Sequence, residues 1–532
     1  MKKLIKALTA SFIFIANTHA SLLNDLPEIN YESFTLDNGL TVVVHEDRKV
    51  PMVAVNVWYH VGSKNEKVGK TGFAHLFEHL MFNGTENYNS EYFEPFEKIG
   101  STDQNGTTNS DRTNYFQNVP TNAVDLALWM ESDRMGHLLG VVDQEKLDEQ
   151  RGVVQNEKRQ GENQPYGKAF TRISEAAFPK GHPYSWTTIG SMEDLDAASL
   201  EDVQEWFKTY YGPNNAVLAL AGDIDLETAR EKVKKYFGDI PAGPPLVKPD
   251  IWIAKRSEEK RDIMYDNVPQ ARIYKAWNVP PRDTEAAAHF DLASSVLVGG
   301  KNSPLFKELV YEKQIATSVS AFYYDREIAG MFIIVVDVVA GQDPKMVEKE
   351  MDTVLQTFTQ KGPNKKLLEA EKTKTLASFI RGAQRIGGFG GKSDLLATCQ
   401  TYTGNPGCYI NNARYIDEST PAKIKSTFIK WIDDTPYVLS IFPSEKLATN
   451  ESTIDRSEGI PYPTEKISFK FPSLQTAKLS NGAKVVLAER KNIPLVEMNI
   501  QFDFGYAQED ADQIGYTNFM MDMLNEGTNK YS

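Results

Sequence analysis

Apolar residues recur at every second position in some segments of the chain and at every third or fourth position in others. The two-residue period predicts strands at 41–45, 53–61, 112–119 and 215–221, and the longer period predicts helices at 92–100, 123–139 and 226–237. Farther along, strands are predicted at 273–277, 316–323 and 331–339, and helices at 286–298 and 345–360. Strands and helices in separate runs indicate an α+β fold, built of duplicated α/β sandwich domains with mixed, mainly antiparallel sheets.

A Pro- and Gly-rich stretch at 240–245 directly follows the helix predicted at 226–237. It divides this part of the chain into a domain at 30–245 and a second α+β domain at 246–450. A Ser-, Pro- and Glu-rich segment at about 451–475 is the predicted linker to a last region at 476–532.

The region at 476–532 repeats the beginning of the chain. Matched turn residues lie 443 positions apart without a gap, as in Asn38-Gly39 and Asn481-Gly482, Gly62 and Gly505, and Gly72 and Gly515. Such a series indicates duplication of a unit of about 440 residues. It also predicts a strand at 496–504 as the counterpart of 53–61. The repeat reaches Ser532 shortly after its counterpart of the helix predicted at 73–81, so we expect a degenerate second unit that is truncated.

The segment 73–81 is a predicted helix with two different faces. Its apolar face carries Phe73, Leu76, Phe77, Leu80 and Met81. At 100° per residue, the other face presents His75, Glu78 and His79 together. Two imidazoles one turn apart can bind one Zn²⁺ and leave room for a third ligand and a water molecule, from which Glu78 would take a proton.

The order H-x-x-E-H is the inverzincin signature. A pair of histidines four residues apart is often only structural, and it is the glutamate beside the pair that favours zinc. In the repeat, the positions of His75, Glu78 and His79 are taken by Asn518, Met521 and Asp522. The second copy therefore lacks the chemistry of the first.

A hydrolytic zinc site needs a third protein ligand, and Glu157 is the candidate that stands out locally. It lies on a predicted helix downstream of the histidine pair. By composition alone it would be a solvated surface glutamate beside Lys158 and Arg159.

Composition and the N-terminus bear on the location of the protein. A net charge of −14 and a pI of about 5.3 argue against nucleic-acid binding and against an anionic membrane surface. Residues 1–20 resemble a signal peptide, with three early lysines, an apolar stretch at 7–16 and cleavage after Ala20. An uncleaved anchor is the alternative. We expect a periplasmic or secreted protein with no membrane span in its mature form.

Cys399 and Cys408 are the two cysteines of the chain and lie in the turn-rich segment CQTYTGNPGC. In an oxidising compartment this segment could close as one local disulfide. A zinc-binding role is disfavoured, because the spacing is wide for a zinc knuckle.

Several motifs resemble the pitrilysin/insulysin-type zinc peptidases, a family that includes the mitochondrial processing peptidases. They are Gly72 to His79 with Asn83-Gly84-Thr85, Arg151 to Glu157, His182-Pro183-Tyr184, Tyr211 to Asn215, Ala221-Gly222-Asp223 and the stretch from Ser303 to Ser320. The resemblance covers roughly residues 30–532, and it is closest to exported bacterial members with two tandem units.

The resemblance implies that His75, His79 and Glu157 bind one Zn²⁺ per chain and that Glu78 is the general base. It also implies a clamshell of two units, in which a peptide or unfolded polypeptide adds as a strand to a sheet edge. The segment 103–108 matches that edge strand, with Asn105 as a substrate contact. Gln150 replaces a glutamate that many relatives carry seven residues before the third ligand, where it would support that ligand without touching the metal.

The resemblance further implies that the second unit supplies an Arg/Tyr pair for the substrate carbonyl, at positions that would follow Ser532. A complementary second-unit chain, or self-association, is therefore an expected partner. The predicted function is that of an exported zinc-dependent endopeptidase. The alternatives are a non-catalytic partner or peptide-binding subunit and an inactive, truncated product.

Overall fold

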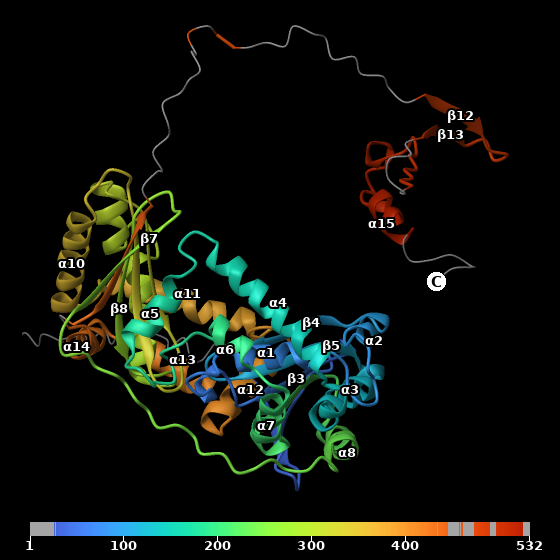
Figure 1. The fold of residues 1–532 in the computed structure, drawn as a ribbon, viewed down its shortest axis with the longest axis horizontal. Coiled ribbons are helices and arrows are strands. Elements are labelled where there is room, and N and C mark those ends of the chain that lie inside the picture. Colours follow the sequence, from blue (N-terminus) through green and yellow to red (C-terminus); the bar gives the residue numbers. More distant parts are fainter. Residues whose placement is uncertain are drawn as a thin grey trace, which may run out of the picture. The chain divides into compact units, whose positions relative to one another are not determined.

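The computed structural model describes residues 26, 28–433, 435–444, 457, 459–460, 473–489 and 496–524 (Figure 1). The predicted signal peptide with its cleavage site after Ala20 lies outside the described residues, and so does most of the predicted linker at 451–475. The chain forms two compact units, Met1–Lys446 and Leu447–Ser532, which are described separately.

The first unit begins with a six-stranded sheet in the order β1-β2-β6-β3-β5-β4. Its strands are β1 (Glu32–Thr35), β2 (Thr41–Glu46), β3 (Met52–Tyr59), β4 (Thr102–Thr108), β5 (Thr113–Pro120) and β6 (Ala216–Gly222). Only the β2–β6 pair is parallel among these described strands. The sequence predicted two strands before the first helix, whereas the structure has three. β1 buries a single side chain, Phe34, and so lacks the alternation that reveals a strand.

Eight α-helices lie in the described part of the first half. They are α1 (Phe73–Leu80), α2 (Glu94–Lys98), α3 (Val124–Gly136), α4 (Gln144–Glu162), α5 (Ala169–Ala177), α6 (Met192–Asp196), α7 (Leu200–Tyr210) and α8 (Leu226–Phe237). α8 has the predicted bounds. α2 is shorter than the helix predicted at 92–100, because it has proline in its first turn and ends before Gly100, whose φ is 71°.

A second sheet of five strands has the order β7-β11-β8-β10-β9. Its strands are β7 (Lys260–Asp266), β8 (Arg272–Val279), β9 (Ala316–Tyr324), β10 (Gly330–Val338) and β11 (Tyr437–Pro443), and β7–β11 is its one parallel pair. Its helices are α9 (Glu285–Val298), α10 (Pro344–Lys361), α11 (Lys365–Gly382), α12 (Lys392–Thr403), α13 (Tyr409–Asp417) and α14 (Pro421–Trp431). Mixed, mainly antiparallel sheets with flanking helices confirm the predicted α+β class.

The two halves of the first unit exchange helices. α5, from the first half, packs on β8 and β11 of the second sheet, opposite the face that packs against α9 and α10 (Figure 1). α12, from the second half, packs on β3 and β6 of the first sheet, where Leu396 meets Trp58 and Val217. The predicted boundary at 245 falls in the irregular segment between α8 and β7, yet buried packing crosses it in both directions.

A buried polar cluster also joins the two halves. The Asp111 carboxylate accepts hydrogen bonds from the Tyr184 hydroxyl at 2.6 Å and from the Glu327 backbone N–H at 3.1 Å. The Glu327 carboxylate in turn pairs with the Lys64 ammonium and lies 2.7 Å from Nε2 of His60. The loop that precedes β10 is therefore held against the segment that precedes α1.

The second unit repeats the local structure that begins the first. β12 (Leu474–Lys478) and β13 (Lys484–Ala488) form an antiparallel hairpin, and α15 spans Tyr516–Met523. α15 lies 443 residues after α1 at both ends, and both helices follow a glycine with positive φ, 88° at Gly72 and 101° at Gly515.

The strand predicted at 496–504 is wrong, since these residues are irregular in the structure. Their apolar side chains are exposed, including Val496 (93%) and Met498 (80%). Their counterparts in β3, Val53 and Val55, are fully buried, because β5 and β6 hold β3 inside the sheet and helices of the first half cover that face. No described strand pairs with 496–504, and an apolar alternation without partners does not form a ladder.

Candidate metal centre

The helix α1 owes its position to tight packing at its first residue. Gly72 adopts φ 88°, and a Cβ placed there would lie 2.8 Å from the Ile189 carbonyl oxygen. Only glycine satisfies both requirements without strain. The predicted apolar face is buried, with Leu76 and Phe77 fully shielded from solvent. The opposite stripe of α1 is thereby directed away from the core.

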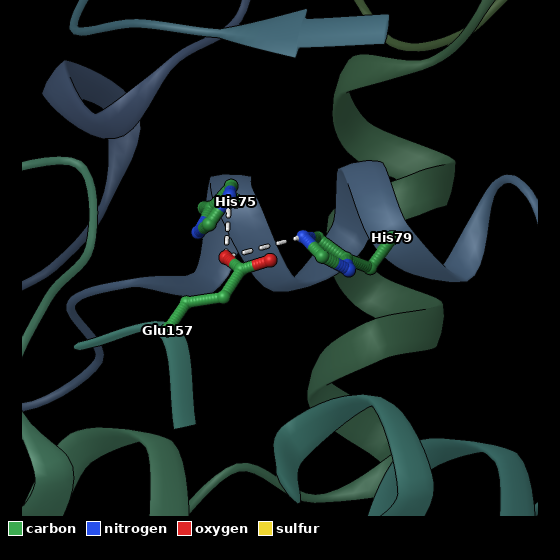
Figure 2. A group of neighbouring side chains, drawn as sticks. All are labelled: His75, His79 and Glu157. Carbon is green, nitrogen blue, oxygen red and sulfur yellow. Dashed lines mark ion pairs between the residues drawn. The ribbon is translucent and has the colours of Figure 1, made fainter. Parts of the chain in front are cut away.

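The structure brings His75, His79 and Glu157 together (Figure 2). Nε2 of each histidine lies 3.7 Å from Oε2 of Glu157, and the two imidazole planes are nearly perpendicular at 88°. The histidine side chains are about one-fifth exposed, at 19% and 20%, and Glu157 is 45% exposed. The three groups thus form an accessible cluster with its donor atoms pointing toward one another.

The packing of α4 against α1 places Glu157 next to the two histidines. The Arg151 guanidinium, on α4, donates to the carbonyl oxygens of Leu195 at 2.9 Å and Ala198 at 2.6 Å. These bonds tie α4 to the segment around α6, which also packs against Gly72. Glu157 is therefore placed by a supported helix, although its side chain is partly exposed.

The donor set fits zinc. Ligand atoms about 2.0–2.1 Å from a tetrahedral ion lie about 3.4 Å from one another, and the 3.7 Å separations need only a small adjustment to reach that value. Two imidazoles and one carboxylate are a donor set of catalytic zinc sites, which keep one position open. Among the described residues this is the one group of three or more histidine, cysteine or acidic side chains that could hold a metal ion.

His75 is neutral at pH 7. Burial, together with the neighbouring His79, lowers the pKa of His75 to about 4. The 3.7 Å between Nε2 of His75 and Oε2 of Glu157 is therefore not an attraction between opposite charges. Nδ1 of His75 is buried without a hydrogen-bond partner among the described residues, and the ring contacts that of His79 edge to face.

Glu78 lies between the two histidines on α1 and is only 8% exposed. Burial raises the pKa of its carboxyl group, while a hydrogen bond from the Thr108 hydroxyl and the charges of His79 and Arg112 oppose that shift. Its backbone carbonyl also accepts the Tyr115 hydroxyl at 3.4 Å. A carboxylate held in this way beside the cluster can accept a proton and return it.

The strand β4 forms the sheet edge next to α1 and pairs on one side only, with β5. Asn105 lies on this edge and is exposed. Its cross-strand partner is Phe116, which contacts Phe389 on the face away from α1. Thr108 is the β4 side chain that reaches Glu78. The role of Thr108 could not be predicted from the sequence, because alternation identifies a face only once the register with β5 is known.

The structure also places three further predicted residues. Gln150 is half-buried on α4, two turns before Glu157 and on the same helical face. Cys399 and Cys408 are bonded to each other, with Cα atoms 5.3 Å apart, and link the end of α12 to the beginning of α13.

Two family models match the chain. Residues 41–189 match "Insulinase (Peptidase family M16)", and residues 197–375 match "Peptidase M16 inactive domain". The first match contains the histidine pair, Glu78 and Glu157.

No helix in the described part of the chain has the length and apolar character required to cross a membrane.

Known proteins agree with these matches. The chain is 29% identical to a zinc protease, PqqE, of Helicobacter pylori over 361 residues, which are 66% of this chain and 79% of the relative. It superposes on a protease structure from Helicobacter pylori with a TM-score of 0.71 and 25% identity, covering 79% of this chain and all of the other. It also shares its fold with the periplasmic protease PqqL from Escherichia coli (TM-score 0.63, 17% identity), covering 88% of this chain and 56% of that one.

Proposed function

Because this chain belongs to the M16 peptidase family, we propose that it is an exported zinc-dependent endopeptidase acting on peptides or unfolded polypeptides. The observation that carries the proposal is the convergence of His75, His79 and Glu157 on one point, with Glu78 on the same helix. Named relatives that are zinc proteases support the class of reaction.

In this proposal, His75, His79 and Glu157 hold one zinc ion per chain. Zinc bound there would supply a Lewis acid and a water molecule of lowered pKa. Glu78 takes the proton from the attacking water and passes it to the leaving amine. Its burial suits the first step, because a carboxylate of raised pKa is a stronger proton acceptor than an exposed one. Gln150 would support Glu157 from the same face of α4.

The free edge of β4 supports a substrate that is extended. An unpaired strand edge offers alternating N–H and C=O groups, and an extended peptide can add to it as a further strand. Only a chain without tertiary structure can lie along such an edge, which favours peptides and unfolded polypeptides over folded proteins. On the far face, Asn105 would contact alternate substrate side chains.

The proposed cellular location and partner rest on separate observations. Lysines at positions 2, 3 and 6 before an apolar stretch support export to the periplasm or the medium. The chain matches 56% of the length of PqqL, which supports a complementary second unit, or self-association, as the partner. A non-catalytic, peptide-binding subunit is the second candidate, because glutamine at position 150, where many relatives carry glutamate, would support Glu157 more weakly than a carboxylate does.

The test compares the full chain with its Glu78→Gln variant. Both are loaded with zinc, analysed for metal content and incubated with a mixed library of quenched fluorescent peptides. We expect about one zinc per chain in both proteins and cleavage by the wild type alone. Zinc without cleavage in either protein would favour the binding subunit. Wild-type protein without zinc would refute the assignment of the metal centre.

A further inference from the structure

Glu66 lies outside the metal centre and is buried without a charged partner of its own. Its side chain is only 6% exposed, and Oε2 has no hydrogen-bond partner among the described residues. Oε1 accepts a hydrogen bond from the backbone N–H of Ala74 at 2.8 Å. The carboxyl group therefore points at the first turn of α1, one residue before His75.

The first turn of α1 has no other side-chain cap. Gly72 occupies the N-cap position, makes no side-chain cap, and no acidic residue lies in the first turn. The leading N–H groups of a helix require partners from outside the helix. α1 has eight residues, and a helix of this length is not stable by its own hydrogen bonds. Its first turn, which carries His75, therefore depends on what the surrounding chain supplies.

The repeat provides an independent copy of the same contact. Glu509 stands 443 residues after Glu66 and accepts hydrogen bonds from the N–H groups of Gly515 at 2.7 Å and Thr517 at 2.5 Å. Thr517 corresponds to Ala74. The second copy has lost the metal ligands but keeps this bond to the start of its helix, so the contact belongs to the helix and not to the metal.

The glutamates of the two copies, Glu66 and Glu509, differ in how far they are buried. Burial raises the pKa of Glu66 to about 8, against the opposing effect of the N–H groups of Ala74 and Gly72. In Glu509, which is partly exposed, hydrogen bonds from Thr517 and Gly515 lower the pKa. The chain thus places an acidic group where water cannot replace it as a cap, and its removal cannot be compensated by solvent.

Glu66 is itself held by a rigid segment. The backbone N–H groups of Ser63 and Lys64 donate to the carbonyl oxygens of Asn109 at 3.2 Å and Ser110 at 2.9 Å. Lys64 also pairs with Glu327 of the second half. The first turn of α1 is therefore connected, through Glu66 and the segment around Lys64, to the contact between the two halves.

We propose that Glu66 is a positioning residue, which caps α1 from a separate loop and thereby sets the distance between His75 in the first turn and His79 in the second. The inference rests on the proposed function only in so far as it concerns zinc. The capping itself can be measured in metal-free protein, so the capping proposal and the proposed zinc peptidase function can be refuted separately.

The experiment uses the full chain with Glu66→Leu, which keeps the bulk and removes the acceptor, and Glu66→Gln, which keeps one acceptor oxygen. Hydrogen exchange of the α1 amides is followed by mass spectrometry in metal-free protein. Loss of a helix cap predicts exchange faster by roughly threefold to thirtyfold in Glu66→Leu and by a smaller factor in Glu66→Gln. The matched control is Glu509→Leu, which removes the corresponding cap in the second unit and should leave exchange in α1 unchanged.

The second readout is zinc affinity, measured by competition with a chromogenic chelator. We expect Glu66→Leu to bind zinc about tenfold or more weakly and Glu509→Leu to bind it as the wild type does. Unchanged exchange in α1 would overturn the inference, and so would faster exchange with unchanged zinc affinity. If Glu66→Leu does not fold, Glu66→Gln decides, and wild-type exchange in that variant overturns the proposal. A wild type that binds no zinc would refute the proposed function, while the exchange data would still judge the capping.

Discussion

Replacement of Glu327 by glutamine should change how the stability of the first unit depends on pH. Burial by itself raises the pKa of this carboxyl group, but the hydrogen bond from His60 and the ammonium of Lys64 outweigh it and hold the pKa at about 2. The side chain is 15% exposed, so solvent screens the interaction little. Glu327 lies in the second half and its partners in the first, which makes it a probe of the joint between them.

The sign follows from the direction of the shift. A carboxyl group with a depressed pKa in the folded state stabilises that state at pH values above its unfolded pKa, and the stabilisation is lost as the pH falls toward the folded value. With a reference pKa of 4.5 and a folded pKa of about 2, the full contribution is about 3 kcal/mol at pH 7. About 1.4 kcal/mol of it should already be lost at pH 3.5.

The assay is urea unfolding followed by tryptophan fluorescence at several pH values from 7 to 3.5, with a chelator present so that zinc does not contribute. Glu327→Gln should be less stable than the wild type at pH 7 by about 3 kcal/mol, because buried Lys64 loses the nearer of its two carboxylate partners and keeps Asp111 at 3.7 Å. The difference between the two proteins should shrink by about 1.4 kcal/mol at pH 3.5. A difference that stays constant with pH would refute the reasoning. Glu46→Gln, an exposed surface carboxylate, is the matched control and should leave the pH dependence unchanged.

Three further predictions concern the metal helix, the third ligand and the disulfide. Leu76→Ala, on the fully buried face of α1, should lower the free energy of unfolding by about 2–5 kcal/mol in urea titrations, whereas Val68→Ala at an exposed position should have little effect. Glu157→Ala should abolish tight zinc binding in a chelator competition, while Glu162→Ala at the end of α4 should not, and equal affinities would remove Glu157 from the ligand set. The double substitution of Cys399 and Cys408 by serine should cost about 2–3 kcal/mol in the same titrations, because a crosslink nine residues apart closes a short loop. Equal stability of the oxidised wild type and the double variant would contradict this.

Local sequence patterns were sufficient to predict the helices and strands that depend on contacts between residues close in the chain. α1 and α8 could be predicted because their apolar residues follow a helical period and because glycine or capping residues mark their ends. The repeat was also visible, and the structure reproduces it in α15 and in the hairpin of β12 and β13. The histidine pair and Glu78 share a face of α1 for the same local reason.

Features that depend on distant parts of the chain required the structure. The apolar alternation at 496–504 is as strong a strand signal as the alternation at 53–59. Only the earlier segment forms a strand, β3, because β5 and β6 pair with it. Similarly, the register of β4 against β5 decides that Thr108 reaches Glu78 and that Asn105 faces away. A one-residue shift would exchange these roles, and nothing in the strand's own residues fixes that register.

The sequence by itself determined which side chains could do the chemistry, because helical spacing places His75, Glu78 and His79 on one stripe without reference to the rest of the chain. Only the tertiary structure decided where that stripe points and what completes it. Glu157 reaches the pair through the packing of α4 on α1. Glu66 reaches the first turn from a loop that is held by the turn between β4 and β5 and by the second half. The physical reason is that the spacing of side chains along a helix is a property of the backbone. Whether separate helices and loops come together depends on which apolar side chains pack against each other, and a local sequence pattern does not show that.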